Sequence, residues 1–122
     1  MQKLSTEWGY AAPAAVDLTG KLNYFGVINS DGEIDLAADG ALVVGTITEE
    51  AALGGDATLS TGFILKVVAG AAITAGAKVA SDGAGMAKTA ATGNFIVGVA
   101  LNSPGAAGVM CEVLVLHAGR AA

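Results

Sequence analysis

Hydrophobic residues in this chain fall in short runs, and Gly, Asp, Asn and Ser separate these runs about every ten residues. Such spacing is typical of an all-β sandwich or barrel. The pattern predicts strands over residues 24–28, 33–37, 42–48, 62–69, 78–80, 86–89, 94–101 and 109–116. We therefore expect a compact β-domain over residues 21–122.

The residues between these runs favour turns over helices. The pairs Asp31-Gly32, Asp39-Gly40 and Asp82-Gly83 tolerate a positive φ and suit tight turns between strands. Helical composition is confined to residues 49–53 (EEAAL), and the two glycines that follow should end this helix after about one turn.

Three of the predicted strands carry a glycine between apolar residues, namely Gly26, Gly45 and Gly98. Glycine weakens a strand unless it permits a bulge, a sharp bend or a close approach of two backbones. This pattern favours a small, strongly coiled barrel. The alternative is that glycine is simply abundant, since the chain contains 18 of them.

Residues 1–20 differ from the rest because their apolar residues follow neither a strand period nor a helix period. They include Trp8, Tyr10, Pro13 and Val16, and aromatic residues are favoured anchors at protein interfaces. We expect an N-terminal arm that docks on a partner protein or a sister subunit through these four residues. The alternative is that Trp8 and Tyr10 pack back onto the domain as a first strand.

The charge distribution excludes several partners. Eleven acidic and six basic residues give a net charge of −5, and the basic residues are dispersed, so we expect no nucleic acid or anionic membrane as a direct partner. The longest uncharged apolar stretch, residues 67–77, is too short for a membrane span. The first residues do not resemble a secretory signal, which predicts synthesis in a cytoplasm.

Reactive side chains are scarce. Cys111 lies inside an apolar run, where a buried and inert thiol is expected. His117 follows the last predicted strand, where a surface or interface position is expected. Without a nucleophile and base at a workable spacing, the chain is predicted to be neither an enzyme nor a cofactor-binding protein.

Two short motifs resemble ligand sites without matching them. Residues 83–89 (GAGMAKT) resemble a phosphate loop, but the glycine spacing is wrong. The side chains of Asn29, Asp31, Glu33 and Asp35 alternate like the first ligands of a calcium loop, but the glycine is misplaced and no later Glu completes the set. We expect no nucleotide or metal at either place.

The middle of the chain supports a more specific hypothesis. Residues 66–101 contain AGAAITAG leading into KVASDGAG and then GNFIVGVAL, and a closing strand, VMCEVLVL, follows. Over about residues 40–117 this order resembles the small capsid cement (head decoration) proteins of tailed bacteriophages.

This resemblance implies a compact and commonly trimeric β-domain that binds the outside of an assembled capsid, with the major capsid protein as its partner. Such a protein would be part of the virion and would hold neighbouring capsomers together against internal pressure. The acidic charge agrees with a position away from packaged DNA. The competing hypothesis is a trimeric receptor-binding or carbohydrate-binding β-module of a phage particle.

Overall fold

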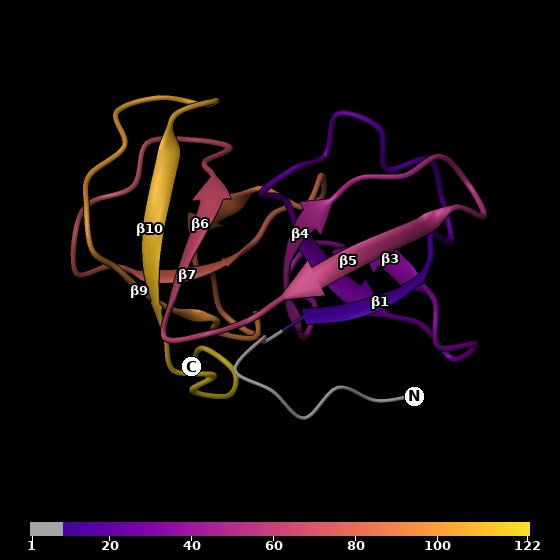
Figure 1. Cartoon of the computed structure of the whole chain (residues 1–122). Coiled ribbons are helices and arrows are strands. Elements are labelled where there is room, and N and C mark those ends of the chain that lie inside the picture. The colour runs from indigo at the N-terminus through magenta and orange to yellow at the C-terminus, as the bar shows by residue number, and fades with distance from the viewer. Residues whose placement is uncertain (1–8) are drawn as a thin grey trace.

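The computed structural model describes residues 9–122 of the chain. Within these residues the structure contains ten strands and no helix, and the strands form two antiparallel five-stranded sheets that lie side by side (Figure 1). The all-β prediction is confirmed. The arrangement is sandwich-like rather than a closed barrel, because only one isolated bridge links the two edges of each sheet.

The first sheet is built from the N-terminal half of the described chain. Its strands, in chain order, are β1 (Gly9–Pro13), β2 (Phe25–Ile28), β3 (Ile34–Leu36), β4 (Gly45–Glu49) and β5 (Asp56–Ser60). Their order across the sheet is β1-β5-β4-β2-β3. The parallel bridge between Ala14 and Ile34 links its two edges.

The second sheet is built from the C-terminal half. Its strands are β6 (Ile64–Val68), β7 (Lys78–Ser81), β8 (Ala87–Thr89), β9 (Gly98–Ala100) and β10 (Met110–Val115). Their order across the sheet is β6-β10-β9-β7-β8. The parallel bridge between Ala69 and Ala87 links its two edges.

The two sheets are copies of one five-stranded unit. Adding five to each strand number of the first sheet reproduces the order of the second, and the edge-to-edge bridge recurs at the same place. Backbone hydrogen bonds recur as well: Val44 N to Gly26 O matches Val97 N to Val79 O, and Ile47 N to Tyr24 O matches Ala100 N to Ala77 O. We call residues 9–60 the first repeat and residues 64–115 the second repeat.

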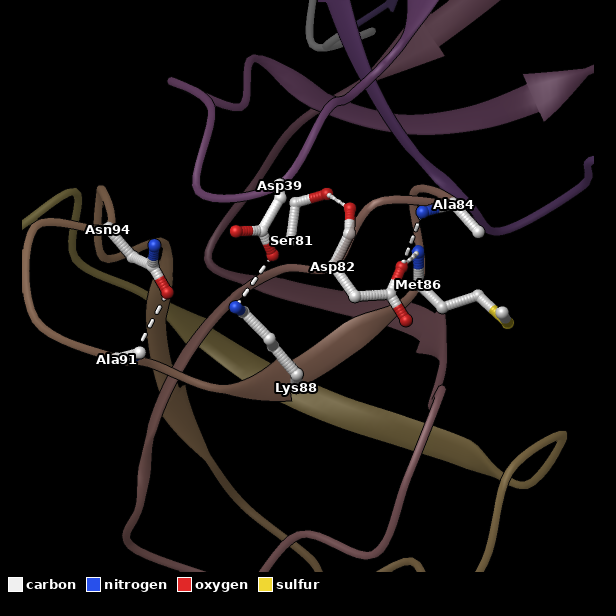
Figure 2. A network of polar contacts seen from close by, with 8 residues as sticks. All are labelled: Asp39, Ser81, Asp82, Ala84, Met86, Lys88, Ala91 and Asn94. Atoms are coloured by element: carbon white, nitrogen blue, oxygen red, sulfur yellow. Dashed lines mark hydrogen bonds and ion pairs between the residues drawn. The ribbon is translucent and has the colours of Figure 1, made fainter.

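The turn between the second and third strands is the same in both repeats. The Asn29 carboxamide oxygen accepts hydrogen bonds from the backbone N–H groups of Asp31 and Glu33. The Asp82 carboxylate accepts them from Ala84 and Met86, as Figure 2 shows. Each turn contains a glycine with positive φ, so the local chemistry of Asx and Gly explains both.

The repeats are joined by backbone contacts and one ion pair. The N–H of Gly40, in the first repeat, donates to the carbonyl of Ser81 over 2.9 Å, and the N–H of Phe25 donates to the carbonyl of Gly85 over 2.6 Å. Beside these bonds Asp39 pairs with Lys88 at 2.7 Å (Figure 2). The Phe25 side chain is fully buried among core residues of the second repeat, so the repeats share part of one core.

Each of the eight predicted strand segments overlaps one observed strand. Strands β4 and β7 extend one residue beyond the predicted segments, and the other six lie within them and are shorter. Strand β5 was not predicted, and β1 corresponds to the alternative in which Tyr10 packs onto the domain as part of a first strand. The predicted helical turn at residues 49–53 is wrong, because Glu49 belongs to β4 and the Ala51 carbonyl accepts a hydrogen bond from Leu18 instead of closing a helical turn.

The N-terminal arm needs a similar correction. Strand β1 pairs along its whole length with β5, and the Leu18 side chain is completely buried. The expectation of an arm without its own fold therefore does not hold for residues 9–18, which pack onto the first repeat. Pro13 is compatible with this strand because β1 is a sheet edge, where a missing N–H is tolerated. Residues 1–8 lie outside the described part of the chain.

Candidate interaction surface

The most exposed large hydrophobic side chain among the described residues is Phe63, at 84%. It lies in the connection between β5 and β6, which joins the two repeats. Ile64 and Leu116 beside it are also more than half exposed, and Thr61, Gly62, Phe63, Val115 and His117 line a shallow, mainly apolar pocket of about 300 Å³. We call the residues Phe63, Ile64, Val115, Leu116 and His117 the Phe63 surface.

Backbone hydrogen bonds hold this surface in place. The N–H of Val115 donates to the Phe63 carbonyl over 2.8 Å, which ties the connection to the end of β10. The N–H groups of Leu116 and His117 both donate to the Val97 carbonyl over 2.9 Å. A preorganised apolar surface loses little conformational entropy when a partner covers it, so its burial favours binding.

The Phe63 surface continues into a strand edge. Strand β6 pairs with β10 on one side and is the edge of the second sheet on the other. Lys66 projects from this strand as an exposed cation, a common means of discouraging unspecific strand pairing. An apolar aromatic beside a charged edge indicates a surface that is kept available for a specific partner.

The four predicted site residues are only partly brought together. Trp8 lies outside the described residues. The Tyr10 hydroxyl donates to the Gly32 carbonyl over 2.7 Å, while Pro13 and Val16 are exposed at and beyond the end of β1. Strand β1 begins near the Phe63 surface, because Gly9 lies opposite Ser60, at the end of β5.

Sequence reasoning missed Phe63 itself. The apolar run at residues 62–69 was predicted to be one strand, which gave Phe63 no special role. The strand begins at Ile64, and Phe63 stays outside it. The one available signal was its place directly after Thr61-Gly62, where a turn is expected.

The side chains that could react or bind a metal, Cys111, His117 and Asn29, do not form a common site. Cys111 is completely buried, as predicted, and this burial raises the pKa of its thiol, with a smaller contribution from the nearby Glu112 carboxylate. His117 is exposed at the rim of the Phe63 surface, as predicted. The Asn29 side chain is engaged in its own turn, and residues 9–122 contain no group of three His, Cys, Asp or Glu side chains arranged to hold a metal ion.

Comparison with known proteins gives the family. The family model described as phage cement protein matches residues 27–117, which is most of the chain. The chain therefore belongs to the phage cement protein family. A search of curated proteins finds no match.

The fold of this cement protein also recurs in a solved structure, titled "The crystal structure of head fiber gp8.5 N base in bacteriophage phi29". The TM-score is 0.73, and the match covers 93% of this chain and 97% of the other. The sequence identity is 15%, so this likeness concerns the fold. The family match includes the whole Phe63 surface, whereas β1, with Tyr10 and Pro13, lies before it.

This cement protein is thus a capsid-associated structural protein of a phage particle. Within residues 9–122, no helix is long and apolar enough to cross a membrane.

Proposed function

We propose that this protein binds the outside of an assembled phage capsid and cements neighbouring capsomers, with the major capsid protein as its direct partner. Its family supports an association with the capsid. Its net charge of −5 and dispersed basic residues favour the outer face over the inner face, where the charge of packaged DNA would repel it.

The observation that carries the proposal is the exposure of Phe63 on a turn fixed by hydrogen bonds. Burial of a large apolar side chain contributes about 1.5–3 kcal/mol, so the Phe63 surface is the best-suited docking area in the described part of the chain. The N-terminal segment with Trp8, Tyr10, Pro13 and Val16 adds contacts to a capsid protein or to a sister subunit, and the Gly9 end of β1 lies near the Phe63 surface.

The cementing effect follows from the number of copies. Each copy that binds across a junction between capsomers stabilises the assembled shell relative to its separated parts. Many copies then slow the opening of the shell when internal pressure or heat strains it. We further propose that the protein acts as a homotrimer, which would give each docking unit three Phe63 surfaces.

The test is binding to heads assembled without this protein. Phe63→Ser should reduce occupancy at least tenfold at subsaturating concentration, because a central aromatic anchor contributes about 2 kcal/mol or more. Leu53→Ser is the matched control, since Leu53 is similarly exposed but lies in the first repeat, away from this surface. Occupancy that Phe63→Ser leaves unchanged would contradict the proposal.

The cementing function needs its own readout. Heads saturated with the protein should release DNA at a higher temperature than bare heads, and the Phe63→Ser protein should lose this protection in proportion to its occupancy. Binding to a glycan array without binding to heads would instead favour the receptor-binding alternative.

A further inference from the structure

The internal repeat shows that one face of the first repeat lacks the partner that covers the equivalent face of the second. In the second repeat this face contains Ser81 and Gly85, whose carbonyls accept hydrogen bonds from Gly40 and Phe25 of the first repeat. The equivalent positions in the first repeat are Ile28 and Gly32, because the two turns match residue by residue. The Tyr10 hydroxyl contacts Gly32, but no other repeat within residues 9–122 packs over Ile28 as the first repeat packs over Ser81.

At these equivalent positions the polar residue is buried and the apolar residue is exposed. Ser81, a polar residue, is 0% exposed, whereas Ile28, a large apolar residue, is 39% exposed. Tyr10 and Pro13 are also exposed in the first repeat, and the Tyr10 hydroxyl donates a hydrogen bond to the Gly32 carbonyl. We call Tyr10, Pro13, Ile28 and Gly32 the Ile28 face. An apolar residue exposed where its counterpart is buried indicates a face that is covered in an assembly.

The second repeat has the complementary surface, and the C-terminal tail covers it. Gly93 is equivalent to Gly40, and its N–H donates to the Ala121 carbonyl, as that of Gly40 donates to Ser81. The tail adds a bond from the Ile96 N–H to the Gly119 carbonyl and places the Arg120 guanidinium 4.6 Å from the centre of the Phe95 ring. Residues 118–122 therefore cover the surface of the second repeat, at Gly93, on which a further repeat would pack.

We propose that a second copy of this chain docks its second repeat on the Ile28 face, in place of its own C-terminal tail. The Gly93 N–H then donates to the Ile28 carbonyl of the other copy, as that of Gly40 donates to Ser81 within one chain. Such a contact is head-to-tail, so it closes into a ring or continues as a filament. The proposal deepens the proposed self-association by assigning its interface and by making the tail its competitor.

Sedimentation velocity at increasing micromolar concentration tests this without capsids. A chain lacking residues 118–122 should reach half-association at a concentration at least about tenfold lower than the full chain, because the competitor is gone. Ile28→Glu, which would bury an unpaired carboxylate in the contact, should abolish this gain, whereas Leu53→Glu, at an exposed position outside the Ile28 face, should not. Unchanged association after the deletion, or after Ile28→Glu in the shortened chain, would overturn the proposal.

A further variant keeps the test decisive if the shortened chain is unstable. Arg120→Ala keeps the tail but removes its contact with Phe95, so it should strengthen association by a smaller factor. Association that Arg120→Ala leaves unchanged would contradict the role of the tail as a competitor. Since no head is present, a negative result here leaves the capsid-binding test independent.

Discussion

Gly45 and Gly98 occupy equivalent positions in the two repeats, and each lies with its Cα against the carbonyl oxygen of a neighbouring strand. That oxygen belongs to Ser60 for Gly45 and to Leu114 for Gly98. A Cβ at either position would overlap the backbone rather than a flexible side chain. The sequence pattern predicted close backbone approach as one role of these glycines, and this role is confirmed.

We predict that Gly45→Ala and Gly98→Ala lower the free energy of unfolding by similar amounts, about 1–3 kcal/mol or more, because each forces two strands apart. Urea unfolding followed by circular dichroism measures this. Gly83→Ala is the control, since a Cβ there meets nothing within 4 Å. Equal stability of Gly45→Ala and Gly83→Ala would show that the strands can separate at little cost.

Two N-terminal deletions should behave differently. Removing residues 2–8 leaves every described strand intact, so the thermal midpoint should change little. Removing residues 2–16 deletes β1 together with the buried Ala12 and Ala14, and should cost about 2 kcal/mol or more through lost strand pairing and apolar burial. Scanning calorimetry of both variants measures the difference. Equal midpoints would mean that β1 contributes nothing to stability.

The two polar links between the repeats should differ in strength. Lys88→Ala should cost about 1 kcal/mol at most, because the Lys88 to Asp39 pair is partly exposed and screened by salt. Gly40→Ala should cost more, because Gly40 has a φ of +66° and a Cβ there would collide with Asn94 of the second repeat. Urea titrations at low and high salt separate the two effects, and only that of Lys88→Ala should shrink with salt.

The Cys111 thiol should react only after the fold opens. Burial raises its pKa, so at pH 8 less thiolate is present in the folded protein than in the unfolded chain, and the side chain is out of reach of a reagent. Alkylation by iodoacetamide, followed by mass spectrometry, should be slow in buffer and fast in urea. Rapid labelling in buffer would indicate frequent local opening around β10.

Local features of the fold could be predicted from the sequence, because neighbouring residues determine them. The short apolar runs located β6 and β10, the Asx-Gly pairs located the turns that Asn29 and Asp82 close, and the apolar run around Cys111 indicated its burial. The family resemblance rested on the same order of strands and turns. None of these features depends on a distant part of the chain.

Features that depend on distant partners could not be predicted in the same way. Strands β1 and β5 are weakly apolar, and they are strands because they pair with each other across more than forty residues. The repeat is visible in the sequence as AADGALVVG at residues 37–45 and AATGNFIVG at residues 90–98, but in a chain rich in Ala and Gly this likeness is inconspicuous.

The sequence by itself determined that this protein is built from short strands joined by tight turns, and it contained the motifs that indicate the family. Only the tertiary structure decided which apolar side chains stay exposed. Phe63 lies at the start and Ile28 at the end of an apolar run that resembles a buried strand, yet both face solvent. The physical reason is that burial depends on what packs from elsewhere: the first repeat covers Ser81, the tail covers the face at Gly93, and nothing in residues 9–122 packs in the same way over Ile28.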